Sequence, residues 1–204
     1  MNFEKVFAFA AILFLGVSAF VFAGSISSSP YTPNSFYQEP TWGSEGAKVK
    51  VVAYIGFEER FSGVWYWNSF GRIISEYEPN EVSVTFVNAP LDFLPNEINA
   101  MKASECAARQ NSYWRYIPLL YLNRTALSEG FLFAYAEKAS LNMKLFNKCF
   151  NSPQTLKEVL SDKTYAFGVL GLSGVPTFFV NDRQIVGAQP YDVFKQAIDQ
   201  ELAG

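Results

Sequence analysis

The chain has 204 residues, of which 50% are hydrophobic and 17% charged, a composition that excludes an intrinsically disordered protein. The net charge of −3 supplies no basic surface for nucleic acid. Histidine is absent, which excludes catalytic triads and histidine-ligated metals, and two cysteines alone cannot form a zinc site, so we expect no metal and no cofactor.

An apolar segment stands at the N-terminus. Residues 6–23 are almost entirely apolar, and the small side chains of Val21 and Ala23 precede a position that suits signal cleavage. The segment also reaches the roughly 18-residue length that can span a bilayer. Residues 1–23 are therefore a signal peptide or an uncleaved membrane anchor. Either alternative makes the rest of the chain extracytoplasmic: periplasmic, secreted or anchored to the outer face of the cell membrane.

The next segments predict a tether and then a folded region. Residues 24–47 are rich in Ser, Pro and Gly and show no period, which predicts a tether. Residues 48–55 and 81–87 are rich in β-branched side chains and predict two strands. Residues 61–77 between them predict a helix. The expected buried face of this helix carries Val64, Trp67, Gly71 and Ile74. One helix between two strands predicts a right-handed βαβ unit with parallel strands.

The second half of the chain begins with helices and returns to strands. Residues 95–170 contain helical faces without a comparable strand, and Pro118 and Pro153 mark expected ends or kinks. Two short apolar runs at 177–180 and 184–186 flank a turn candidate, which predicts a hairpin, and a C-terminal helix follows.

The order β-α-β, helical block, β-β, α predicts an α/β, thioredoxin-like fold. It covers residues 48–204, with a helical insertion at about 95–170. Five stretches of the sequence resemble, in order and spacing, segments of one known family: residues 43–54, 88–91, 105–120, 146–149 and 174–194. On these residues the chain is similar to the DsbA family of extracytoplasmic thiol–disulfide oxidoreductases.

The resemblance fails at the family's redox motif. The family carries Cys-X-X-Cys at the start of the helix after its first strand. In this chain the matching positions are Glu59, Arg60, Phe61 and Ser62. Thiol–disulfide exchange needs an attacking thiolate and a second thiol, and a serine hydroxyl does neither task. We therefore expect a domain that has kept the family scaffold, has lost its redox motif and is not an enzyme. The acidic pair Glu58-Glu59 is expected to be a solvated helix start.

The resemblance also implies a peptide-binding loop. The family's cis-proline loop matches Val175, Pro176 and Thr177, and we expect a cis bond before Pro176. Phe61 and Trp65 are the neighbouring aromatic residues expected to be exposed, although the alternative that all these aromatics are core stays open. The main hypothesis is thus a holdase or assembly factor that binds extended segments of exported proteins. A purely structural subunit of an envelope complex is a further alternative.

The two cysteines leave another function open. Cys106 and Cys149 both lie in the helical block, and an even pair in an oxidising compartment predicts a structural disulfide. Two free buried thiols are a further alternative. We favour the structural bond, because nothing in the sequence places either cysteine at an electropositive site. The alternative function is a thiol–disulfide oxidoreductase of the DsbA family that acts through Cys106 and Cys149.

Overall fold

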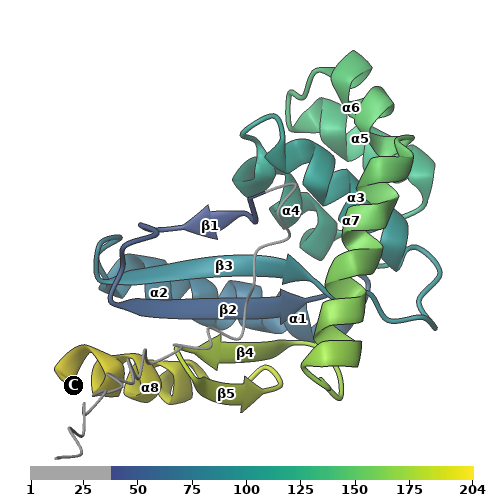
Figure 1. The fold of residues 1–204 in the computed structure, drawn as a ribbon. Helices are drawn as coiled ribbons and strands as arrows, with labels where there is room; N and C mark the ends of the chain where they lie inside the picture. Colours follow the sequence, from purple (N-terminus) through teal and green to yellow (C-terminus); the bar gives the residue numbers. More distant parts are fainter. Residues whose placement is uncertain (1–37) are drawn as a thin grey trace, which may run out of the picture.

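The computed structural model describes residues 38–204 as a sheet with helices around it and a helical block at one end (Figure 1). The expected signal or anchor segment, residues 1–23, lies outside the described residues. Among the described residues, no helix is both long and apolar enough to cross a membrane. The sheet has five strands in the order β1-β3-β2-β4-β5. Their bounds are β1 Thr41–Trp42, β2 Val49–Ile55, β3 Val82–Asn88, β4 Thr177–Val180 and β5 Arg183–Val186.

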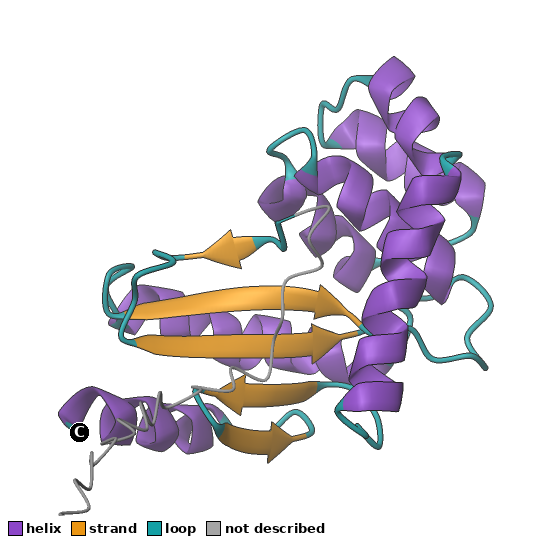
Figure 2. Ribbon diagram, viewed as in Figure 1, coloured by secondary structure: helices purple, strands orange, loops and turns teal. Residues whose placement is uncertain are grey.

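The centre of the sheet follows the predicted topology. Strands β2 and β3 are parallel, with Val51 opposite Val84, which confirms the βαβ unit. Strand β4 is antiparallel to β2, and β5 pairs antiparallel with β4 through the predicted hairpin. Every residue of β2 except Lys50 is buried, because helices cover both faces of the sheet (Figure 2). This double coverage explains why β2 reads as an almost continuous apolar run.

The segment between β2 and β3 is a continuous helical stretch that buries a different face from the predicted one. It consists of α1 Arg60–Trp65, the π-helical turn η1 Tyr66–Phe70 and α2 Gly71–Glu76. Trp65 and Phe70 are buried, while Trp67 and Ile74 are exposed. The π turn has more residues than an α turn, so positions five apart share a face. Trp65 and Phe70 therefore lie on the same side of the helix. A regular 3.6-residue period does not predict this arrangement.

The helical block predicted at 95–170 lies between β3 and β4. Its elements are α3 Glu97–Ala108, α4 Tyr113–Leu122, α5 Glu129–Lys138, α6 Met143–Phe150, α7 Pro153–Lys163 and the π-helical turn η2 Thr164–Val169. Pro118 lies inside α4 and does not end it. Pro153 is the first residue of α7, where its missing N–H breaks no helical hydrogen bond. Helix α7 runs from the block to the sheet, where it contacts β3 (Figure 1).

The fold is completed by a helix at its C-terminal end and a short strand at its N-terminal end. The C-terminal helix α8, Tyr191–Ala203, buries Phe194 and Ile198. Strand β1 pairs antiparallel with β3, with Thr41 opposite Thr85. The expected tether boundary at residue 48 is therefore too late. Residues 41–47 belong to the folded region, and a two-residue strand in a Ser-, Pro- and Gly-rich stretch is too short to produce a periodic pattern.

Candidate active site

The start of α1, where the resemblance puts the family's redox motif, is held by acidic side chains. Glu59 is the N-cap residue, and its carboxylate accepts hydrogen bonds from the backbone N–H groups of Phe61 and Ser62. Glu58 accepts from the backbone and the side-chain amide of Asn96, at 2.8 and 2.9 Å. Both carboxylates are half-buried, so the expectation of a solvated acidic pair is wrong. Burial raises the pKa of Glu59, and its hydrogen bonds with Ser62 oppose that rise.

Ser62 anchors the loop that leads into α1. It is completely buried, and its Oγ accepts a hydrogen bond of 3.0 Å from the backbone N–H of Gly56. Phe61 is 58% exposed, as predicted. Trp65 is completely buried, so its expected place on an exposed peptide-binding surface is wrong. Its ring lies 4.5 Å from Phe178 and 5.5 Å from Phe86, centroid to centroid, and thus fills the core between helix and sheet.

The loop before β4 has the predicted conformation. The Val175–Pro176 peptide bond is cis, which confirms that prediction. Thr177 opens β4 and donates from Oγ1 to the carbonyl of Gly174 at 2.8 Å. The carbonyl of Pro176 accepts from the backbone N–H of Gly187 at 2.8 Å. The loop is therefore tied to the hairpin that follows it.

The two cysteines form a disulfide between two helices of the block. Cys106 lies in α3 and Cys149 in the last turn of α6, with their Cα atoms 5.7 Å apart. Cys106 is completely buried, whereas Cys149 is half-buried. A cavity of about 310 Å³ opens beside them and is lined by both cysteines and by Arg109, Lys148 and Ser152, among others. The disulfide is thus within reach of a molecule that enters this cavity.

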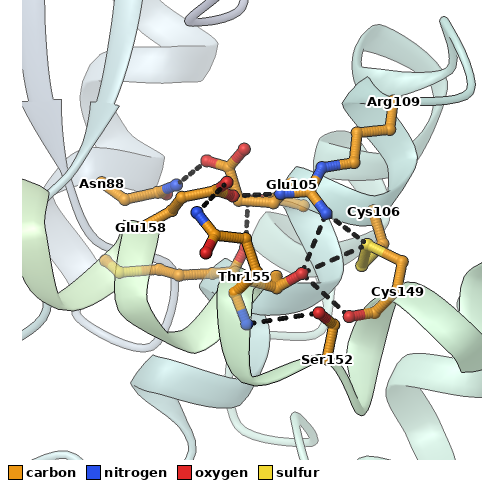
Figure 3. Close-up of polar contacts among 11 residues, drawn as sticks. Asn88, Glu105, Cys106, Arg109, Cys149, Ser152, Thr155 and Glu158 are labelled. Atoms are coloured by element: carbon orange, nitrogen blue, oxygen red, sulfur yellow. Dashed lines mark hydrogen bonds and ion pairs between the residues drawn. A yellow bond between two sulfur atoms is a disulfide. The ribbon is translucent and has the colours of Figure 1, made fainter. Parts of the chain in front are cut away.

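A guanidinium group lies beside the half-buried sulfur. The Nη1 atom of Arg109 lies 3.4 Å from Cys149 Sγ (Figure 3). Lys148 lines the cavity beside this sulfur. Two further contacts hold the Arg109 side chain in place: it donates to Thr155 Oγ1 at 2.9 Å and forms an ion pair with Glu158. A thiolate is stabilised by nearby cations. The sequence showed no positive charge near either cysteine. The packing of α3, α6 and α7 brings Arg109 next to Cys149 in the folded protein.

The start of helix α7 adds to this setting. Ser152 caps α7 and lines the cavity, and Thr155, three residues on, is completely buried against the disulfide. Thr155 donates from Oγ1 to the carbonyl of Cys149 at 2.9 Å and lies 3.6 Å from its sulfur. Helix N-termini carry partial positive charge, which offsets the unfavourable position of Cys149 at the C-terminus of α6. The start of α7 therefore adds partial positive charge near the Cys149 sulfur.

Curated relatives match this chain through one part of their length. An Na(+)/H(+) antiporter NhaA of Herminiimonas arsenicoxydans is 26% identical over 148 residues, which are 72% of this chain and 23% of the antiporter. NhaA 3 of Salinispora tropica is 30% identical over 154 residues, which are 74% of this chain and 22% of the antiporter. The chain spans less than a quarter of these relatives' length.

Solved structures share the fold over most of both chains. BdbD from Bacillus subtilis, in its oxidised form, has a TM-score of 0.74 at 22% identity, covering 81% of this chain and 94% of that one. Alpha-DsbA1 of Wolbachia pipientis has a TM-score of 0.73 at 20% identity, covering 85% and 93%. A thioredoxin-like oxidoreductase from Silicibacter pomeroyi has a TM-score of 0.71 at 18% identity, covering 88% and 98%. At such identities the likeness establishes the fold.

The expectation that this chain is not an enzyme is wrong. Cys106 and Cys149 form a disulfide that borders an open, cationic cavity, a setting that the sequence did not reveal. The structural relatives include DsbA-type proteins and a thioredoxin-like oxidoreductase. The chain therefore has a cysteine pair that a redox reaction could use, which removes the ground for expecting no enzyme.

The family itself follows from the sequence match along the chain. The family model described as Thioredoxin matches residues 36–200, which include all five strands and every helix of the insertion. The match begins before β1, in agreement with a fold that starts earlier than residue 48. The chain therefore belongs to the thioredoxin family that this model describes.

Proposed function

We propose that this protein is a DsbA-like thiol–disulfide oxidoreductase whose redox pair is Cys106–Cys149. The observation that carries the proposal is the position of the Cys149 sulfur, half-buried at a cationic cavity and 3.4 Å from Arg109. The chain has two cysteines, so exchange by its own sulfurs must use this pair. The positions expected to match the family's redox motif hold Glu59 and Ser62, which cap and anchor a helix instead.

The proposed reaction transfers two electrons from a substrate dithiol to the disulfide. A substrate thiolate attacks Cys149 Sγ, the S–S bond breaks, and Cys106 leaves as a thiolate that takes a proton. The second substrate thiol loses its proton and attacks the substrate sulfur of the mixed disulfide. Cys149 then leaves as a thiolate. The substrate ends oxidised to a disulfide and the protein ends with two thiols, and the reverse steps reduce a substrate disulfide.

Cys149 is the sulfur under attack because of its exposure and its charged neighbours. Cys106 is completely buried, while Cys149 faces the cavity. Arg109 and Lys148 attract an incoming thiolate and stabilise Cys149 when it leaves in the second step. The proposed substrates are thiols in extended segments of exported proteins. The proposed location is extracytoplasmic, which agrees with a stable disulfide and with a periplasmic thioredoxin-like protein of Salmonella enterica among the structural relatives.

A second candidate role is binding of extended peptide segments beside Val175, Pro176 and Thr177. The observation in its favour is the Phe61 ring, which is 58% exposed at the start of α1. Exposed aromatic side chains suit apolar peptide segments. This role uses residues other than Cys106 and Cys149, so it can coexist with redox activity.

The experiment that tests the redox function is reduction of insulin by dithiothreitol, catalysed by the full chain. We expect the wild type to exceed the uncatalysed rate, and the Cys106→Ser/Cys149→Ser variant to fall to that rate. The Cys106→Ser variant alone should trap mixed disulfides on Cys149, detectable by mass spectrometry. Melting curves of both variants show whether they remain folded.

A second outcome of the same experiment would contradict the redox proposal. If the wild type does not exceed the uncatalysed rate, and its cysteines resist alkylation in native protein treated with dithiothreitol, the disulfide is a structural link and the redox proposal fails. This result is obtained on the wild type alone, so it does not depend on the stability of a variant.

A further inference from the structure

Three carboxylates from distant parts of the sequence meet where the sheet joins the helical block. Glu39 precedes β1, Glu105 lies in α3, and Asp162 lies in α7. One oxygen of each lies within 4.8 Å of the others. All three residues are buried, at 6%, 2% and 7% exposure. The three carboxylates therefore come from segments that lie far apart in the sequence.

The cluster concentrates negative charge away from water. Glu158 is a fourth buried carboxylate nearby, and it forms an ion pair with Arg109. Burial raises the pKa of Glu105, which the neighbouring Arg109 partly opposes. Burial, and then the carboxylates of Glu105 and Glu158, raise the pKa of Asp162. Buried carboxylates in this number favour added positive charge, and a bound metal ion is one means by which proteins supply it.

A buried amide aimed at the cluster gives independent evidence for a ligand. Asn88, at the end of β3, is 3% exposed, and its Nδ2 donates to the carboxylate of Glu105 (Figure 3). Its Oδ1 is buried and has no hydrogen-bond partner. A half-turn of the amide exchanges the two atoms and directs Oδ1 toward Glu105. In that orientation a cation would take the amide oxygen as a ligand and satisfy it.

We propose that Glu39, Glu105, Asp162 and Asn88 bind one hard divalent cation of the Ca²⁺ class. Such ions prefer carboxylate and amide oxygens at about 2.4 Å, so two ligands on opposite sides of Ca²⁺ lie about 4.8 Å apart. The oxygens of the cluster are within this separation. Mg²⁺ demands near-ideal octahedral geometry at about 2.1 Å and gives up its water reluctantly, so a buried cage of protein ligands suits it less well than Ca²⁺. We expected no metal because histidine is absent and two cysteines cannot form a zinc site, but carboxylates from distant segments do not show up in that reasoning.

The test uses the full chain after treatment with EDTA, with Tb³⁺ as a luminescent substitute for Ca²⁺. Tyr113 is buried and interacts electrostatically with Glu105 and Glu39, so its ring is placed to sensitise Tb³⁺ emission. We expect saturable emission on excitation of tyrosine, displacement by Ca²⁺ at concentrations at least tenfold below those of Mg²⁺, and a melting temperature that rises by about 5 °C or more with Ca²⁺.

Matched variants locate the site. Glu39→Gln and Asp162→Asn are near-isosteric, remove one charge each and should weaken Tb³⁺ and Ca²⁺ binding at least tenfold. Glu129→Gln, an exposed carboxylate in α5, should bind as the wild type does. The proposal is overturned if calorimetry on the wild type detects no Ca²⁺ binding up to millimolar concentration. It is also overturned if either cluster variant, folded by circular dichroism, binds as tightly as the wild type.

Discussion

Arg109 contacts the Cys149 sulfur and the Glu158 carboxylate with the two ends of one guanidinium group. The ion pair and the Thr155 hydroxyl hold the guanidinium in place, so Nη1 stays near the sulfur without the entropy cost of a free side chain. Arg109 thus holds a positive charge beside the proposed redox pair. Lysine would lose this double contact, because its ammonium is a single point of charge.

At the residue scale, we predict that Arg109→Met slows alkylation of the reduced Cys149 thiol at pH 7 by about tenfold, since a charged hydrogen bond contributes about 1.5 kcal/mol. Iodoacetamide trapping of pre-reduced protein, followed by peptide mass spectrometry, measures this rate for Cys149. The control is Arg115→Met, because Arg115 is exposed and its guanidinium bonds Ser112 rather than a cysteine. Equal rates in the two variants would show that Arg109 does not activate the sulfur.

Helix α1 shows how an acidic side chain stabilises the start of an element. Glu59 receives two backbone N–H groups that would otherwise have no partner, and a carboxylate is favoured at the positive end of a helix. We predict that Glu59→Ala lowers the free energy of unfolding by about 1 kcal/mol. Urea denaturation measures the loss. Glu59→Gln keeps one acceptor oxygen and should recover part of it, and an unchanged midpoint in the alanine variant would contradict the capping role.

The same element shows what the sequence can and cannot predict. The βαβ unit, the helical block, the hairpin and the cis bond before Pro176 followed from periodicity and from the family resemblance. The exposure of Trp65 was predicted wrongly, because Trp65 shares the buried face of α1 with Ser62 and the π turn at Tyr66–Phe70 keeps Phe70 on that face. Strand β1 was missed because two residues carry no period. The charge at Cys149 could not be predicted, since Arg109 reaches the sulfur only through the packing of separate helices.

At the scale of the whole molecule, the helical block and the sheet are joined by contacts that involve a buried carboxyl group. Glu97, at the first position of α3, is completely buried and accepts the backbone N–H groups of Phe57 and Glu58 at 2.7 and 2.6 Å. These residues follow β2, so this carboxylate fastens the block to the sheet. Burial raises the pKa of Glu97 to about 7, with the backbone hydrogen bonds opposing and the neighbouring Glu59 and Glu58 adding to the rise.

The sign of the resulting pH dependence follows from proton binding. Between about pH 4.3, the unfolded value for glutamate, and pH 7, folded Glu97 holds a proton that the unfolded chain releases. The stability associated with this proton is fully present below the unfolded pKa and is lost as the pH rises through the folded pKa. The free energy of unfolding therefore falls across this window, and above it the contribution of Glu97 no longer changes.

We predict that the stability difference between the wild type and Glu97→Gln becomes less favourable to the wild type by about 2 kcal/mol from pH 5 to pH 8. Glutamine does not titrate, and all other carboxylates are common to both proteins, so the difference isolates Glu97. Urea denaturation at four pH values across the window measures it. Parallel stability curves for the two proteins would mean that Glu97 stays ionised when buried, held by its two backbone donors. In that case the junction between block and sheet carries a fixed charge instead of a proton.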